Sequence, residues 1–273
     1  MTPPIVFLSD FGYRNEWVGI CHVVINRIAP DSSILDLSHG VPPLDVMAGA
    51  LVLSDCLPFI RHDAVVLAVV DPSVGRDRDI AIRTVDGRLL VGPDNGLLAP
   101  AWRAAEGIDQ AVSVTSSAIV LEPVSPSLHA RDVLAPAAAH LATGASLDAL
   151  GDPIEVGTLA ELRIPEPDVE PGKISCEVLD LNRFGNVQLN VRSSHLAAAG
   201  LDRSSRLAVQ TTSAEAVAEQ VATYSDLEGG QWGLMVDPRG WLSVIRANPG
   251  NAAADLSIGV GDLVWLAPAS GSS

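Results

Sequence analysis

The chain has 273 residues, of which 48% are hydrophobic and 18% charged, as expected for one large or two modest folded domains with a sizeable core. Its 33 acidic and 17 basic side chains give a formal net charge of −16, which argues against nucleic acid and anionic membrane as partners. No apolar run approaches the roughly 20 residues that span a bilayer, and the opening MTPPIVFLSD lacks the basic start of a signal peptide. We therefore expect a cytoplasmic protein that has no membrane partner.

Short apolar runs alternate with helix-like segments from residue 4 to about residue 155. Strands that are buried on both faces and alternate with helices favour an α/β domain with a largely parallel, Rossmann-like sheet. We expect strands at residues 5–9, 33–38, 64–70, 80–85, 88–92 and 118–122, and helices at residues 16–29, 43–60 and 131–144.

The pattern changes where prolines and glycines gather in EPDVEPGK, which is typical of a linker between domains. Beyond it the apolar runs are short, alternating and separated by turns, which favours a small all-β barrel or sandwich. We expect an N-terminal α/β domain over residues 1–160, a linker over 161–172 and a smaller C-terminal β domain over 173–273. Its expected strands are residues 173–181, 186–191, 205–211, 233–237, 241–246 and 262–267.

Several expected strands of the first domain end on acids, namely Asp10, Asp71 and Asp94. Ligands of open α/β sheets collect at the carboxyl ends of the strands, so these acids are candidates for one binding edge. Aspartate before glycine or proline is also ordinary turn chemistry, and each acid alone is equally well explained as a turn or cap residue. His129 directly precedes the expected helix 131–144, which places its ring near the same edge.

Other chemistries have little support in the sequence. No HxH or HExxH motif occurs, and His22, His39, His62 and His195 have no partner at metal-ligand spacing, so we expect no metal site. No GxSxG or glycine-rich phosphate loop is present either, which leaves covalent catalysis and a phosphate cradle unsupported. The cysteines are too far apart for a disulfide framework and are interpreted as core residues: Cys21, Cys56 and Cys176.

Five stretches, in this order, resemble the S-adenosyl-L-methionine (SAM) hydroxide adenosyltransferases, relatives of the fluorinase and chlorinase: SDFGYRNEWVG, VVDPSVGRDR, VGPDNG, HARDVLAPAAAHLATG and RFGNVQLN. The segment 250–266 resembles the closing segment of that family. The resemblance implies an α/β domain followed by a β-barrel domain, and a homotrimer whose active sites lie between the N-terminal domain of one subunit and the C-terminal domain of its neighbour. It also implies that water attacks C5′ of SAM, without a cofactor, to give adenosine and L-methionine.

By matching position, the resemblance assigns the catalytic roles to Asp71, Arg78 and His129. A sulfonium leaves readily, so the task of the enzyme is to deliver an oxygen nucleophile in line with C5′. Because free water has a pKa of about 15.7, polar groups must orient or deprotonate it. We expect Asp71 and His129 to position the water and Arg78 to favour its hydroxide character. Asp10 matches the acid that holds the ribose hydroxyls.

The remaining substrate contacts are expected in the C-terminal domain. Phe184 and Asn186 match the residues that contact adenine, and their side chains suit stacking on a purine and reading its polar edge. The family usually has an aspartate two residues before this phenylalanine, where this chain has Asn182. Contact with the methionine ammonium is therefore expected to shift to Asp180 or to weaken, and Asn182 is kept as a candidate binding residue. Tyr224 is either a further stacking residue or part of the core.

Two arginines of DPRGWLSVIR complete the expected site. Resemblance to the halogenases implies that Arg239 binds the methionine carboxylate and that Arg246 lies near adenine. Each would otherwise be explained by an ordinary surface ion pair.

The turn after the strand 64–70 distinguishes hydrolysis from halogenation. Halogenases have tyrosine where this chain has Asp71 and threonine where it has Val74, and a carboxylate there repels an approaching halide. We interpret Arg76, Asp77 and Asp79 as solvated loop charges. The alternatives are a SAM-dependent halogenase and a protein that binds SAM or adenosine without turnover.

Overall fold

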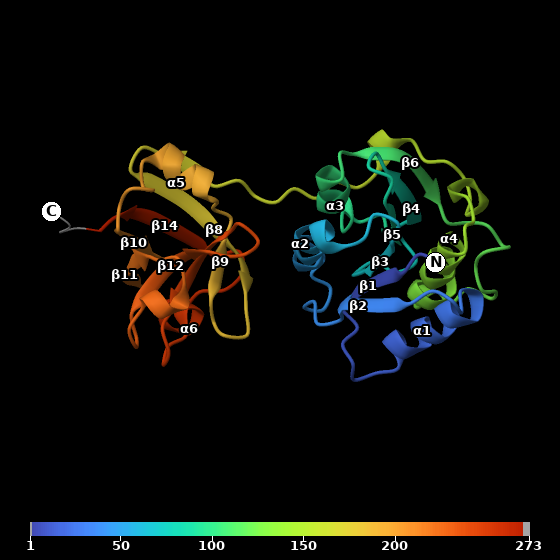
Figure 1. Ribbon diagram of the computed structural model, residues 1–273, viewed down its shortest axis with the longest axis horizontal. Coiled ribbons are helices and arrows are strands. Elements are labelled where there is room, and N and C mark those ends of the chain that lie inside the picture. The colour runs from blue at the N-terminus through green and yellow to red at the C-terminus, as the bar shows by residue number, and fades with distance from the viewer. Residues whose placement is uncertain (1, 270–273) are drawn as a thin grey trace. The chain divides into compact units, whose positions relative to one another are not determined.

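The computed structural model describes residues 2–269. The chain divides into two compact units, of which the first ends at Arg163 and the second begins at Ile164. Each unit has its own sheet (Figure 1). Each unit also has its own buried hydrophobic residues.

Within residues 2–163, six strands form one sheet in the order β2-β1-β3-β5-β4-β6. Strands β2, β1, β3 and β5 pair in parallel, whereas β4 is antiparallel to both of its neighbours. The short turn through Asp86 and Gly87 joins β4 to β5, and only antiparallel strands accept so short a connection. The prediction of a largely parallel α/β sheet is confirmed. The strands are β1 (Ile5–Ser9), β2 (Ile34–Ser38), β3 (Val65–Val69), β4 (Asp79–Thr84), β5 (Leu89–Pro93) and β6 (Ile108–Ser113).

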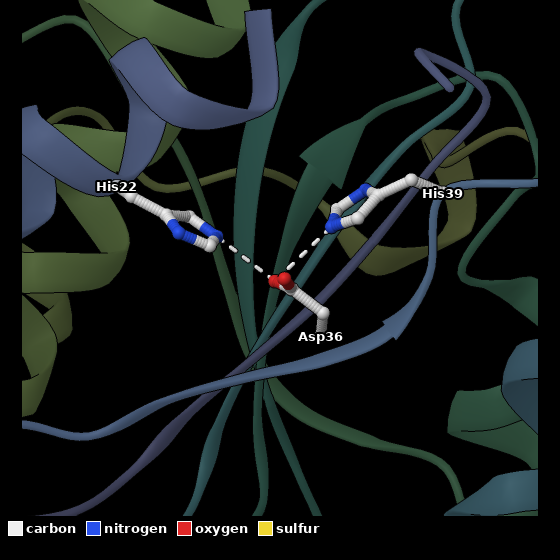
Figure 2. A group of neighbouring side chains, drawn as sticks. All are labelled: His22, Asp36 and His39. Atoms are coloured by element: carbon white, nitrogen blue, oxygen red, sulfur yellow. Dashed lines mark hydrogen bonds and ion pairs between the residues drawn. The ribbon is translucent and has the colours of Figure 1, made fainter. Parts of the chain in front are cut away.

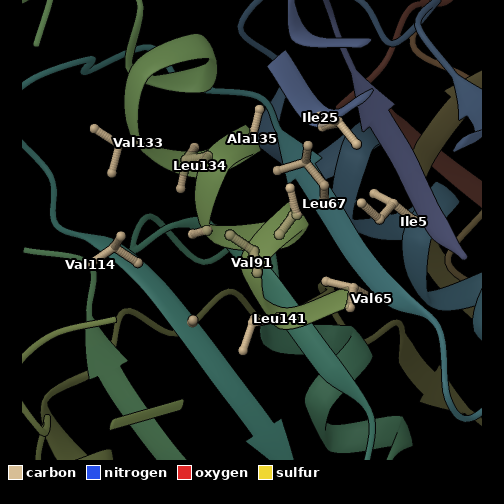
Figure 3. Packing of buried hydrophobic residues seen from close by; sticks show 14 of the residues in the cluster. Ile5, Ile25, Val65, Leu67, Val91, Val114, Val133, Leu134, Ala135 and Leu141 are labelled. Carbon is tan, nitrogen blue, oxygen red and sulfur yellow. The ribbon is translucent and has the colours of Figure 1, made fainter. Parts of the chain in front are cut away.

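Helices cover both faces of this sheet. Helices α1 and α4 pack on one face, where Ile25 and Leu141 meet Leu67 of the central strand in one buried cluster (Figure 3). Helices α2 and α3 contribute Leu53 and Trp102 to the cluster on the other face. The helices are α1 (Trp17–Ile28), α2 (Val46–Cys56), α3 (Ala99–Ala104) and α4 (Ala135–Ala142), with single turns η1 (Leu57–Phe59), η2 (Ala130–Leu134), η3 (Leu147–Ala149) and η4 (Val156–Thr158).

Three expectations for this unit are wrong or incomplete. Residues 118–122 form a turn, in which the Ile119 and Val120 amides donate to the Ser116 carbonyl, although a short apolar run reads equally well as a strand. The edge strand β6 was missed because its sequence, IDQAVS, is half polar. Helix α3 was missed because it has only six residues and a proline in its first turn.

Within residues 164–269, eight strands form the sheet β14-β10-β11-β12-β13-β9-β8-β7, and β14 also pairs with β8. Seven strands therefore close into a barrel, which confirms a β-barrel over a sandwich, and β7 extends its edge at β8. The strands are β7 (Asp168–Glu170), β8 (Lys173–Leu181), β9 (Val187–Leu189), β10 (Arg206–Gln210), β11 (Glu215–Gln220), β12 (Trp232–Val236), β13 (Leu242–Arg246) and β14 (Leu263–Pro268).

The barrel unit is not purely β. It carries the short helices α5 (Ser193–Ala199) and α6 (Ala252–Leu256) and the single turn η5 (Tyr224–Asp226). Strand β7 lies inside the segment expected to be a linker, and β11 was not predicted because EAVAEQ is half charged. In the described part of the chain, the helices are too short or too polar to cross a membrane.

The close approach of β3 and β5 generates a stability prediction. A Cβ added at Gly92 would lie 2.5 Å from the carbonyl oxygen of Ala68, whereas one added at Gly19 in α1 meets nothing within 4 Å. Gly92→Ala should lower the free energy of unfolding by about 1–3 kcal/mol. Gly19→Ala should raise it by about 0.4–1 kcal/mol, because alanine restricts the unfolded chain and suits a helix.

Denaturant unfolding followed by the helical circular dichroism signal would compare the two variants. Equal midpoints for Gly92→Ala and wild type would contradict the close contact between these strands.

Candidate active site

A cavity of about 310 Å³ lies in the first unit, at the carboxyl ends of β1 and β3. Asp10 follows β1 and Asp71 follows β3, and both line the cavity together with His129 and Val74. Three of the side chains expected to act on the substrate are therefore brought together, although they are up to 119 positions apart in the chain. Its other walls are largely apolar and include Phe11, Trp17, Pro43, Leu44, Val69, Leu128 and Leu134.

Asp71 is the acid at the centre of this group. Burial raises its pKa above the ordinary value, and the negative charges of Asp77 and Asp10 add to this effect. The hydrogen bond from the Ser73 amide to Oδ1, 2.8 Å long, and the charge of His129 act in the opposite direction. With its pKa raised, the carboxylate is a stronger base than an exposed aspartate.

His129 is oriented by an acid that sequence reasoning misjudged. Its Nδ1 lies 2.6 Å from Oδ2 of Asp79, the first residue of β4, whose side chain is only 9% exposed. Asp79 is thus a buried partner of His129, and its interpretation as a solvated loop charge is wrong. Burial raises the pKa of Asp79, while the hydrogen bond and charge of His129 offset part of the shift.

The contact at Nδ1 leaves Nε2 as the ring nitrogen that can serve a ligand. Nε2 lies next to the turn that follows Asp71, because a Cβ added at Gly75 would come within 3.8 Å of it. Gly75 has a φ of +79° and permits this turn. No sequence signal connects Asp79 with a histidine 50 positions away, although its place at the start of an expected strand made burial foreseeable.

Arg78 does not line the cavity within the part of the chain described here. Its Nη2 lies 2.5 Å from Oδ2 of Asp94 and donates to the Thr158 carbonyl oxygen at 2.9 Å. Asp94, whose side chain is 4% exposed, also accepts the Ala160 amide at 2.8 Å. The Arg78–Asp94 pair therefore fastens the segment around η4 to the end of β5.

Asp10 uses one oxygen to shape the cavity wall. Its Oδ2 accepts the Leu44 amide at 2.8 Å, and Leu44 adopts a φ of +65°. A positive φ is strained for leucine, so this hydrogen bond holds the loop before α2 in an otherwise unfavourable conformation. In the described part of the chain, the second oxygen, Oδ1, makes no hydrogen bond, and Asp10 lines the cavity, so this atom is available to a ligand.

The residues expected to bind substrate in the second unit line two hollows. One hollow, of about 540 Å³, is lined by Asp180, Asn182 and Arg239, and the other, of about 710 Å³, by Phe184 and Arg246. Both hollows share the side chains of Asn186 and Tyr224. Asn186 donates from Nδ2 to the Tyr224 hydroxyl at 2.8 Å, so the shared wall is held by a hydrogen bond.

The turn before β9 shapes this wall. Oδ1 of Asn182 accepts the Phe184 and Asn186 amides at 3.0 and 3.1 Å. Gly185 has a φ of +78°, and a Cβ there would lie 2.2 Å from the Asn251 side chain. Asn182 is therefore occupied in holding the turn, whereas the ring of Phe184 stands 66% exposed.

The two arginines have carboxylate neighbours. Arg239 lies 3.7 Å from Asp180 and 3.6 Å from Asp237. Arg246 donates to Asp255, whose pKa it lowers, and its guanidinium lies 5.0 Å from the Trp232 ring centroid. Asp237 was missed by sequence reasoning, although it lines the first hollow and accepts the Gln188 side-chain amide at 2.7 Å.

One group in the described residues has the chemistry of metal ligands, although the sequence offered no spacing that predicted it. It consists of His22, Asp36 and His39. These three residues lie outside the lining of the cavity that contains Asp71.

Comparison with known proteins identifies relatives over nearly the full length. An (R)-S-adenosyl-L-methionine hydrolase from Salinispora tropica is 41% identical over 262 residues, which is 96% of both chains. The enzyme of that name from Thermus thermophilus is 39% identical over 67% of this chain and 72% of its own. A fluorinase from an Actinoplanes species is 25% identical over 95% of this chain and 97% of its own.

The fold and the family agree with this relationship. A crystal structure of an uncharacterized conserved protein from Thermotoga maritima superposes with a TM-score of 0.89 at 29% identity, over 96% of this chain and 99% of the other. The models of the SAM hydroxide adenosyltransferase N-terminal and C-terminal domains match residues 5–151 and 176–265. The chain therefore belongs to the SAM hydroxide adenosyltransferase family.

Proposed function

We propose that the protein is a SAM hydrolase, in which water attacks C5′ of the ribose and releases adenosine and L-methionine. The observation that carries the proposal is the meeting of Asp71 and His129 in one cavity at the carboxyl ends of the parallel strands. The relatives that are about 40% identical are named for the (R)-sulfonium form, so we propose this form as the substrate. SAM is the substrate itself, and the reaction that we propose uses no cofactor.

In the proposed reaction, the water oxygen forms a bond to C5′ as the C5′–S bond breaks and its electron pair passes to sulfur. Methionine leaves as a neutral thioether, so its departure needs no proton. The proton that water loses passes to the Asp71 and His129 pair. The raised pKa of Asp71 supports its part as acceptor.

Asp79 has a positioning role in this proposal. Its contact with Nδ1 of His129, 2.6 Å long, holds the ring so that Nε2 is directed to the reacting water. Arg78 supplies positive charge from outside the cavity lining, where Asp94 and Thr158 hold its guanidinium. This charge favours hydroxide character in the water as the new bond forms.

The binding residues divide according to the chemistry of the substrate. Asp10 accepts hydrogen bonds from the ribose hydroxyls, as carboxylates commonly do in dinucleotide-binding α/β folds. In the hollow of about 540 Å³, Asp180 carries the charge that complements the methionine ammonium and Arg239 the charge that complements its carboxylate, with Asn182 beside them.

The second hollow of the barrel suits the adenine. Phe184 offers an exposed aromatic face for stacking, with Arg246 at the same hollow. Asn186 and Tyr224 belong to both hollows and provide polar groups for the purine edge. We propose that the substrate extends across this shared wall.

We further propose a cytoplasmic homotrimer, in which the cavity of one subunit's first unit and the hollows of a neighbouring subunit's barrel form each active site. Exposed apolar side chains line the cavity and also the hollows of the barrel. Such exposed apolar surface supports the proposal that a partner subunit or a ligand covers it. Leu44 and Val74 are 60% and 37% exposed, and Phe184 and Tyr224 are 66% and 51% exposed.

Hydrolysis is favoured over halogenation by the charge of the cavity. Asp10 and Asp71 both line it, and Val74 offers no hydroxyl to a halide. A halide entering there meets two carboxylates, which repel it. The fluorinase from Actinoplanes is 25% identical to this chain, whereas the hydrolase from Salinispora tropica is 41% identical.

Incubation of the full chain with (R)-SAM in buffer without halide should release adenosine and L-methionine in equal amounts, measured by liquid chromatography with mass detection. Added chloride or fluoride should give no 5′-haloadenosine. Halide-dependent product would favour the halogenase, and calorimetric binding of SAM without any product would favour a binding protein.

Asp71→Asn should lower kcat at least about 100-fold, because an amide neither accepts the proton of water nor orients it in the same way. Binding of adenosine, measured by calorimetry, should be retained. Asp77→Asn is the matched control, since it removes a neighbouring charge of the same turn and should keep kcat at pH 7 within about twofold. An unchanged kcat in Asp71→Asn would remove this residue from the mechanism.

Asp79→Asn should lower kcat about 10- to 100-fold with little change in KM, because the His129 ring loses the acceptor that orients it. Activity falls at low pH as the carboxylates are protonated. In Asp79→Asn the acidic side of the kcat profile should move to lower pH, because the repulsion between Asp79 and Asp71, which disfavours their ionised forms, is removed. A purely structural role for Asp79 would instead lower the melting temperature and leave the profile in place.

A further inference from the structure

His22, Asp36 and His39 converge in the first unit from separate elements (Figure 2). His22 lies in α1, Asp36 in β2, and His39 follows the end of β2. Nε2 of His22 and Nε2 of His39 lie 2.9 and 3.1 Å from the same oxygen, Oδ1 of Asp36. One ligand atom from each of the three residues falls within 4.8 Å of the others.

His39 is oriented by a hydrogen bond at one ring nitrogen, as metal-ligating histidines are. Its side chain is fully buried, and its Nδ1 shares a hydrogen bond of 2.7 Å with Oγ of Ser9. When Nδ1 donates to Ser9, the lone pair of Nε2 is directed at the group, which is the arrangement that outer partners impose on metal ligands. Within the described part of the chain, the one polar contact of Nε2 is with Oδ1 of Asp36 at 3.1 Å, and this contact lacks the geometry of a normal hydrogen bond. A buried nitrogen that is only weakly satisfied in this way can turn to a metal ion as a better partner.

Asp36 supplies the negative charge. Its Oδ1 faces both imidazole rings, and an aspartate side chain is ordinarily ionised at neutral pH. The side chains of Asp36 and His22 are 28% and 32% exposed, so an ion can reach the group from solvent.

We propose that His22, Asp36 and His39 bind one divalent transition-metal ion, with Zn²⁺ as the expected ion and water at the fourth position. Two imidazole nitrogens and one carboxylate oxygen form a ligand set that suits Zn²⁺ and excludes Mg²⁺ and Ca²⁺, which prefer oxygen. Two ligands of a tetrahedral zinc ion lie about 3.4 Å apart, given bonds of about 2.1 Å. Small rotations of the side chains produce this separation from the contacts of 2.9 and 3.1 Å.

The ion would connect α1, β2 and the loops beside the cavity. The carbonyl oxygen of His39 accepts the Gly12 amide at 2.7 Å, and Gly12 follows Asp10 by two positions. Leu44, which follows His39 in the chain, donates its backbone amide hydrogen to the Asp10 carboxylate. Metal binding would therefore stiffen one wall of the cavity without adding a group to the hydrolytic residues, and this inference stands independently of the proposed reaction.

The test uses the untagged full chain, freed of metal by a chelator and then titrated with Zn²⁺ by calorimetry and with Co²⁺ by visible absorption. One ion per chain should bind, and Co²⁺ should give the absorption bands of a tetrahedral site. At metal concentrations 100 times Kd, the melting temperature should rise by about 5–10 °C. Absence of binding by the wild-type protein would overturn the proposal.

Variants locate the site. His22→Gln and Asp36→Asn are partly exposed changes that should fold, and each should weaken binding at least about tenfold and abolish the Co²⁺ bands. His62→Gln is the matched control, since His62 lies in the same unit beside Asp86 and should bind metal as wild type does. Equal affinity in His22→Gln, Asp36→Asn and wild type would mean that the three residues form only a hydrogen-bonded cluster, and would overturn the proposal.

Discussion

The parallel pairing of β1 with β3 is the constraint on which the candidate active site depends. Its register places Ser9 opposite Val69, so Asp10 and Asp71 leave the sheet at nearly the same level. The strands are buried along their whole length, and the sheet is therefore fixed by apolar packing on both faces. The same burial that orders the strands withdraws water from Asp71 and raises its pKa, so folding and acid–base chemistry have one physical origin.

The two units contribute different kinds of groups to the proposed reaction. The first unit holds compact, partly buried acids and a histidine, which suit proton transfer to and from water. The barrel holds wider hollows, in which Asp180 and Arg239 lie near each other with opposite charges and Phe184 exposes its ring. In the proposed reaction, such groups would recognise a zwitterion and a purine rather than transform them. If the α/β unit carries out the reaction and the barrel recognises the substrate, this division of roles would explain why the family has both domains.

Much of this arrangement followed from the sequence, because the strongest signals are local. Buried strands such as β3, acids placed directly after them, and the place of His129 just before a helix can be predicted from the sequence pattern. The family resemblance supplied the expected role of His129 and the barrel residues. Contacts between segments that are distant in the chain could not be predicted from the sequence. Asp79 was misjudged since its partner is 50 positions away, and His22 gave no metal signal because Asp36 and His39 reach it only through the pairing of β2 with β1 and the packing of α1. The turn at residues 118–122 was taken for a strand because apolar burial alone does not distinguish the two.

The π-helical turn η2 lies between His129 and α4. It allows the direction of the His129 ring and the packing of α4 to be set independently. Each residue of an α-helix advances the side-chain direction by about 100°, so a helix that began at His129 would tie the direction of the imidazole to the phase of the apolar face of α4. The wider turn holds one additional residue and breaks this phase relation. The alanine-rich helix α4 can therefore stay packed in the core, while the direction of the His129 side chain is set independently of it. A one-residue deletion within Ala130–Leu134 would restore an ordinary helical phase and turn the imidazole of His129 away from the carboxylates, although His129 itself would be unchanged.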